Sequence, residues 1–223
     1  MAYSDSTESG NAQLKPSVSI LQPPMTAQIN DTFRYGDADY SVAGISEGEL
    51  FDPAILDLKP SMASTACWRG YQVLYSVLDR HLVVADLHVN LLEEEVHGYS
   101  RKVGPLINGV LPIGPDEDFD FFNNHYEGIN YHLEYTGGLL LADGFIEELY
   151  VHMGFHPAWK YQSVIELLFE NGVLVDEFDR SERMADIREM ISEPRADAGE
   201  RQMPTEDEIR VFVERAFDRK YRL

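Results

Sequence analysis

This sequence has little cysteine and no long apolar run, and these two features argue against disulfide-linked and membrane-spanning proteins. The chain of 223 residues has one cysteine, Cys67, which excludes an intramolecular disulfide and fits a reducing compartment. No stretch reaches the roughly 18 uncharged apolar residues of a membrane-spanning helix. The first residues lack the basic start and apolar run of a secretory signal. We therefore expect a soluble, cytoplasmic protein.

Basic residues are also few, and this limits the partners. Lys and Arg number 18 against 39 Asp and Glu, which gives a formal net charge of −21. Nucleic acids and anionic membrane surfaces are poor partners for such a chain, because both require clustered positive charge. Residues 103–159 contain nine acidic residues and no Lys or Arg. This block either keeps the protein dispersed or presents an electronegative surface that steers a basic partner.

The motifs of several common catalytic and cofactor sites are missing as well. The sequence has neither the Gly-rich strand-to-helix turn of Rossmann and P-loop sites nor the GxSxG nucleophile elbow. The pair His152 and His156 has the spacing of two zinc ligands on a helix, but Gly154 and Pro157 make that stretch a poor helix. We therefore predict no cofactor and no metal centre.

What the sequence does contain is 44% hydrophobic residues, enough for a core, and they first follow the period of strands. The clearest predicted strands are residues 32–35, 40–45, 68–77, 83–91 and 129–135. The first two flank a Gly-Asp turn and are expected to form a hairpin. Asn108-Gly109 signals a second hairpin. In 83–91, the odd-numbered positions are expected to form the apolar face.

After Pro157 the apolar residues change to the period of a helix. The predicted helices run from Pro157 to about residue 170, from 181 to about 191, and from 205 to about 217. Asn171-Gly172 fits the stop of the first helix. Because strands come first and helices later, we predict an α+β fold. Its mainly antiparallel sheet covers about residues 30–155, with two or three C-terminal helices packed on it.

The predicted domain organisation has four parts. Residues 1–28 are rich in Ser, Thr, Pro and Gln, and are expected to form a flexible N-terminal arm. Residues 29–193 form the α+β core domain and residues 194–204 a polar linker. Residues 205–223 form an amphipathic helix that docks either on the core or on a partner.

The acidic segment that begins at Asp116 is the main candidate site. Its oxygen donors have the spacing of a calcium loop, but Phe121 stands where that loop requires Gly, so an ordinary acidic loop is favoured. Aromatic residues alternate with the acids, which suits either core packing or an interface facing Arg and Lys. The predicted partner-binding residues are Asp116, Glu117, Asp118, Asp120, Phe121, Phe122, Tyr126 and Glu127.

An enzyme with an unrecognised site is the alternative. Its candidate residues are His125, His132 and His152 with a carboxylate near the acidic loop, where a His–carboxylate pair could transfer protons. Each of these histidines also fits a structural or surface position. The segment from Cys67 to Tyr71 is distinctive, but it is expected to supply a buried cysteine and packing residues.

The function predicted from the sequence is therefore that of an acidic interaction protein. It would bind and mask a basic partner, as an immunity or inhibitor protein does, and it would need no catalytic residue. The identity of the partner and the oligomeric state stay open.

Overall fold

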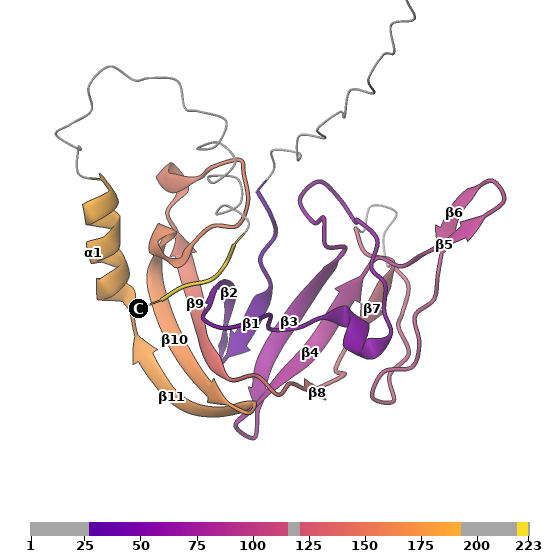
Figure 1. The fold of residues 1–223 in the computed structure, drawn as a ribbon, viewed down its shortest axis with the longest axis horizontal. Coiled ribbons are helices and arrows are strands. Elements are labelled where there is room, and N and C mark those ends of the chain that lie inside the picture. Colours follow the sequence, from indigo (N-terminus) through magenta and orange to yellow (C-terminus); the bar gives the residue numbers. More distant parts are fainter. Residues whose placement is uncertain (1–26, 116–120, 193–217, 223) are drawn as a thin grey trace, which may run out of the picture.

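One large, strongly curved β-sheet dominates the computed structural model, which describes residues 27–115, 121–192 and 218–222 (Figure 1). The strands are β1 (Thr32–Tyr35), β2 (Ala38–Ile45), β3 (Tyr71–Leu78), β4 (His81–Val89), β5 (Leu92–Glu95), β6 (Gly98–Arg101), β7 (Asn124–Tyr126), β8 (Tyr131–His132), β9 (Gly137–Phe145), β10 (Tyr161–Glu170) and β11 (Val173–Asp179). In the main sheet the order is β11-β10-β9-β2-β1-β3-β4-β7, with β8 also paired to β4. Strands β1 and β3 run parallel. Val173 of β11 pairs with His81 of β4, so the sheet closes back on itself.

The concave side of this sheet holds the main core. Phe33, Val42, Val73 and Leu167 are completely buried there, although they come from four different strands. The predicted hairpin of β1 and β2 is confirmed, with Thr32 opposite Ser41. Burying such side chains is the main favourable contribution to folding. The curved sheet therefore acts as a rigid frame for the loops at its ends.

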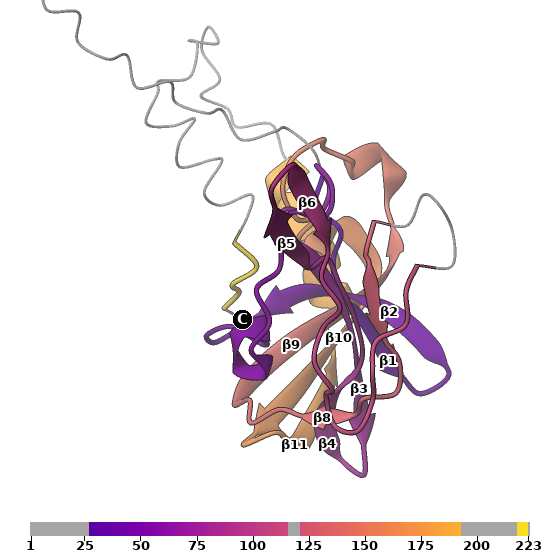
Figure 2. The same ribbon diagram turned by 90° about the vertical axis from the view of Figure 1, so that its right-hand side faces the viewer.

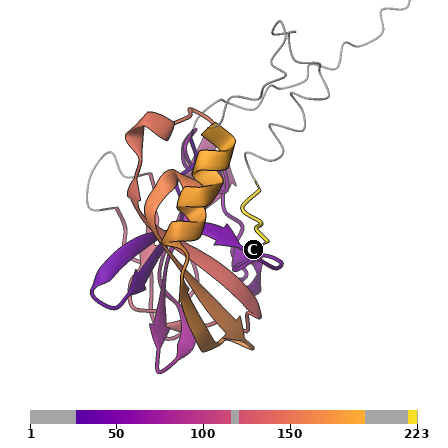
Figure 3. The same ribbon diagram turned by 90° about the vertical axis from the view of Figure 1, so that its left-hand side faces the viewer.

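Among the described residues, a single α-helix covers part of the outer side of the sheet. Helix α1 (Ser181–Ser192) packs on β10 and on the short 3-10 helix Ala158–Lys160 (Figure 3). The predicted helix at this position is confirmed. Met184 is buried and Ile187 is partly buried against Val164, whereas Ile191 is exposed. Two other short 3-10 helices span Pro53–Leu56 and Glu147–Leu149.

The predicted fold class is wrong, because the described residues are mostly strand and contain only one α-helix. The expected helix after Pro157 is in fact strand β10, which pairs with β9 on one side and β11 on the other. Its apolar run is buried on both faces, with Leu167 in the main core and Val164 under α1. A short apolar run of this kind fits a doubly covered strand as well as a helix. Asn171-Gly172, taken as a helix stop, is the turn between β10 and β11, with both residues at positive φ.

Two strand predictions need smaller corrections. In β4 the pairing with β3 shifts between Leu74 and Tyr75, which leaves Ala85 as an extra residue. Leu82 and Val84 therefore face the main core before the shift, whereas Leu87, Val89 and Leu91 face it afterwards as predicted, so the expected alternation fails only in the first part of 83–91. Of the predicted strand 129–135, only Tyr131–His132 pairs as a strand.

The predicted parts outside the core domain are not covered by the described residues. The linker 194–204, residues 205–217 of the predicted C-terminal helix and the arm up to residue 26 fall outside them. Within the described part of the chain, no helix has the length and apolar character needed to cross a membrane.

Candidate functional site

The predicted interface residues divide into three groups. Asp116, Glu117, Asp118 and Asp120 lie outside the described residues. Phe121 is 57% exposed and Glu127 is exposed, so both face solvent.

The other two predicted interface residues are part of the fold. Phe122 and Tyr126 are buried, and the Tyr126 hydroxyl donates a hydrogen bond to the carbonyl of Pro105 at 2.8 Å. The ring of Phe122 lies against that of His88, with centroids 6.1 Å apart. These two aromatic residues therefore hold the loop on the sheet rather than facing a partner.

The histidines proposed for an enzyme site lie in separate places. His125 on β7 faces His88 on β4, with ring centroids 4.3 Å apart. His132 on β8 lies beside His81, at 5.3 Å. His152 lies in the connection between β9 and β10 and contacts Tyr150. Among the described residues, no group of three or more His, Cys, Asp or Glu side chains is placed to hold a metal ion.

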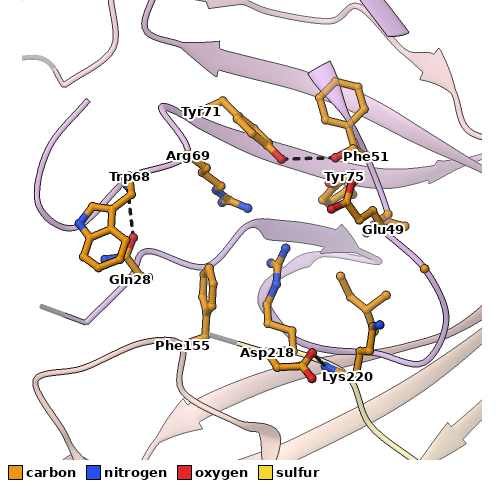
Figure 4. Close-up of a pocket in the computed structure, with 14 residues that line it drawn as sticks. Gln28, Glu49, Phe51, Trp68, Arg69, Tyr71, Tyr75, Phe155, Asp218 and Lys220 are labelled. Atoms are coloured by element: carbon orange, nitrogen blue, oxygen red, sulfur yellow. Dashed lines mark hydrogen bonds between the residues drawn. The ribbon is translucent and has the colours of Figure 1, made fainter. Parts of the chain in front are cut away.

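A pocket of about 340 Å³ beside the end of β2 and the start of β3 was missed by the sequence analysis (Figure 4). Its walls come from Gln28, from residues 48–51 and 68–71, from Phe155 and from residues 218–220. These segments lie far apart in the sequence and meet only in the folded chain. A pocket of this size lies within the range that holds small organic ligands.

A buried carboxylate organises the charges behind this pocket. Asp31, directly before β1, has a side chain only 1% exposed. Its Oδ1 accepts from Arg69 Nη2 at 2.6 Å, and its Oδ2 accepts from Arg69 Nη1 at 2.7 Å and from Arg219 Nη1 at 3.1 Å. The backbone N–H of Val73 also donates to Oδ1, at 2.9 Å. One carboxylate therefore fixes two guanidinium groups and the start of β3.

The electrostatics of this cluster favour the charged forms of Asp31 and Arg69. Burial alone would raise the pKa of Asp31, but Arg69 and Arg219 outweigh it and hold that pKa below its ordinary value. The carboxylate in turn raises the pKa of Arg69, against the effect of burial. Because two cations share one anion, the cluster keeps one formal positive charge in a protein of net −21.

Aromatic rings cover both arginines. Figure 4 shows Arg69 extending between Tyr71 and Phe155. Its Cζ is 4.8 Å from the ring centroid of Tyr71 and 5.9 Å from that of Phe155. The Cζ of Arg219 lies 4.7 Å from the same Phe155 ring. Cation–π contacts of this kind restrict the guanidinium groups to one orientation.

Burial favours the neutral form of the two tyrosines of the pocket, Tyr71 and Tyr75. Burial raises the pKa of Tyr71 and raises that of Tyr75 still further above its ordinary value. The Tyr71 hydroxyl donates to the carbonyl of Phe51 at 3.3 Å. At the rim, Glu49, Asp218 and Lys220 are exposed, so the entrance carries charges of both signs.

The C-terminal segment supplies the second arginine. The Ile45 N–H donates to the carbonyl of Arg219 at 2.9 Å, and the Tyr221 N–H donates to the carbonyl of Ile45 at 3.3 Å. The Tyr221 hydroxyl donates to Glu166 Oε1 on β10 at 2.7 Å, and Arg180 holds the same carboxylate. Arg219 is thus positioned by its own backbone carbonyl and by Tyr221 two residues later.

The segment from Cys67 to Tyr71 forms one wall of the pocket. Cys67 is buried, as predicted, and burial raises the pKa of its thiol. Gly70 has a φ of +73°, and a Cβ there would lie 2.0 Å from the carbonyl oxygen of Ser61. Only glycine fits this turn, which directs Arg69 and Tyr71 toward the pocket. An arginine among aromatic residues in an acidic chain was the available signal, but its partner Asp31 was not evident from the sequence.

Comparisons of the chain with protein-family models, with curated proteins and with solved structures find no match. The assignment of a function therefore depends on the geometry described above.

Proposed function

We propose that this protein binds a small organic anion with an aromatic or otherwise planar body in the pocket beside Arg69 and Arg219. The observation that carries the proposal is the buried Asp31, which holds two arginines together and neutralises only one of them. A guanidinium group has five N–H donors in a fixed plane, which suits a carboxylate or phosphate. The remaining positive charge favours an anionic group at the floor of the pocket.

The walls define the rest of the ligand. Phe51, Tyr71, Tyr75 and Phe155 line the pocket with ring surface. An aromatic ring between such walls replaces water by apolar contact, and its acidic substituent reaches the arginines. The orientation of both guanidinium groups is already fixed in the structure, so little ordering is needed on binding.

The test uses calorimetry on the full chain with three ligands of similar shape: benzoate, phenyl phosphate and the neutral benzamide. We expect at least one of the two anions to bind. Benzamide should bind with an affinity at least roughly 10-fold lower, because a neutral ligand cannot form the charge-assisted hydrogen bonds. Benzoate and phenyl phosphate distinguish a carboxylate site from a phosphate site.

The matched variants are Arg219→Gln and Arg222→Gln. Both remove one positive charge from the C-terminal segment, but only Arg219 lines the pocket. Loss of a hydrogen bond to a charged group corresponds to a fall in affinity of roughly 10- to 100-fold for Arg219→Gln, and Arg222→Gln should bind as the wild type does. Equal binding of benzamide, or an unchanged affinity in Arg219→Gln, would refute the proposal.

A second candidate function is the binding of a basic partner protein in the cytoplasm, with nucleic acid excluded by the net charge of −21. The exposure of Phe121 and Glu127 at the border of the acidic loop favours it. Its test is the comparison of partner binding by Phe121→Ser and Glu127→Gln with binding by the wild type.

A further inference from the structure

We infer that the β5–β6 hairpin and the following loop, residues 92–113, form a docking surface for a basic, partly apolar segment of a partner protein. This inference rests on the second candidate function and gives it a location. It does not depend on the pocket.

The hairpin stands apart from the rest of the molecule. Strands β5 and β6 pair with each other in a separate two-stranded sheet, with Leu92 opposite Arg101. Figures 1 and 2 show this hairpin projecting beyond the large sheet, on the side opposite α1. A lone two-stranded hairpin is marginally stable in water, and a partner packed against it would stabilise it.

Large apolar side chains are concentrated on this projection. Val96 is 93% exposed and Tyr99 is 73% exposed. In the following loop, Val103, Leu106 and Leu111 are each more than 60% exposed. Half of the exposed large hydrophobic residues in the described structure come from residues 92–121. Such a concentration is typical of an interaction surface, whereas isolated exposed apolar residues are not.

The charge of the region indicates the occupant. Glu93, Glu94 and Glu95 follow one another on β5, and all three are exposed. Within residues 92–113 these three acids stand against two bases, Arg101 and Lys102, and the whole chain has a formal net charge of −21. Arg101 extends toward the loop, where its Nη2 donates to the carbonyl of Ile113 at 3.4 Å. A second copy of this chain would bring like charges together, so a basic segment is the complementary occupant.

The binding experiment starts from a random dodecapeptide display library selected on the immobilised full chain at low salt. A parallel selection uses the double variant Val96→Ser, Tyr99→Ser. We expect the peptides that the wild type enriches and the variant loses to combine Lys or Arg with aliphatic or aromatic residues. Enrichment without a positive-charge bias, or equal enrichment by the variant, would overturn the inference.

The affinity of the best peptide is then measured for several variants of the chain. This comparison distinguishes binding at the hairpin from a general attraction of basic peptides to an acidic protein. The triple variant Glu93→Gln, Glu94→Gln, Glu95→Gln should slow association, whereas the double hairpin variant should speed dissociation by roughly 10-fold or more. Helix α1 offers a matched control for each variant, with every change at an exposed position. The control for the triple variant is Glu182→Gln, Asp186→Asn, Glu189→Gln. The control for the double variant is Met190→Ser, Ile191→Ser. These controls should change the affinity by no more than about twofold, as expected for distant sites.

Three further outcomes would decide against this surface. Equal losses in the α1 controls would show that the whole acidic protein attracts the peptide. A loss confined to Phe121→Ser and Glu127→Gln would place the second candidate function at the acidic loop and overturn the hairpin as its location. A dimer in sedimentation that dissociates in the hairpin variant would replace the basic partner by a second copy.

Discussion

The pocket and the β5–β6 hairpin both combine aromatic and charged side chains, but they are stabilised in opposite ways. In the pocket, Asp31 joins Arg69 and Arg219, which lie 38 and 188 residues away in the sequence. In the hairpin, β5 and β6 pair with each other across a short turn, and Val96 and Tyr99 remain exposed. The difference shows that the fixed pocket depends on contacts between distant segments. The exposed hairpin needs only a local turn.

The largest effect should come from removing the carboxylate that joins those distant segments. Asp31→Asn leaves two partly buried guanidinium groups without their counter-charge, and we expect a loss of about 3–5 kcal/mol in the free energy of unfolding. Asp39→Asn is the control, because Asp39 pairs with Arg34 at the surface, where an ion pair contributes at most about 1 kcal/mol. Urea denaturation measures both variants. Similar losses in the two would contradict the central role of Asp31.

The pocket and the hairpin each contain a glycine with a positive φ, which extends the comparison to the backbone. Gly70→Ala should lower the free energy of unfolding by about 2–4 kcal/mol, because the new Cβ would strain the backbone and collide with the Ser61 carbonyl. Gly98 of the hairpin also has a positive φ, but a Cβ there would meet nothing within 4 Å. We expect Gly98→Ala to leave the global unfolding midpoint nearly unchanged, and a large shift would show that the hairpin is coupled to the core.

Lowering the pH should weaken the pocket side of the molecule. His156, next to Phe155, is buried. Its burial, and to a smaller extent the positive charge of Lys160, lower the pKa of His156 from 6.5 to about 4. The unfolded chain therefore binds the proton near pH 6.5, whereas the folded chain binds it only near pH 4. Stability should fall as the pH decreases across this window.

The control for this pH dependence is again in the hairpin. His156→Gln should flatten the dependence of the melting temperature between pH 6.5 and 4, whereas the same exchange at exposed His97 should leave it in place. If both variants keep the wild-type profile, the titration of His156 is not its cause.

The smallest effect on folding should come from the exposed hairpin itself. Tyr99→Ala should change the free energy of unfolding by less than about 0.5 kcal/mol, as surface substitutions usually do. Tyr126→Ala removes a fully buried ring beside Pro105 and should instead lower the free energy of unfolding by about 3–5 kcal/mol. A large loss in Tyr99→Ala would mean that the hairpin packs on the core in solution, which would leave less of it free for a partner.

The sequence was sufficient where conformation depends on neighbouring residues. The turn after Tyr35 predicts the β1–β2 hairpin, and the periodicity of Met184 and Ile187 predicts α1. Alternation places Val73 and Tyr75 on the core side of β3, as observed. In each case the pattern of one segment already distinguishes its buried side from its exposed side.

Only the tertiary structure decided the rest. The run from Val164 to Phe169 is apolar except for the buried Glu166 and shows no solvent-facing side, so its conformation depends on the neighbouring β9, β11 and α1. The pocket likewise exists because sheet curvature and the C-terminal segment bring Asp31, Arg69 and Arg219 together. Local periodicity carries no information about such long-range contacts, since each segment is compatible with many partners until the whole core is packed.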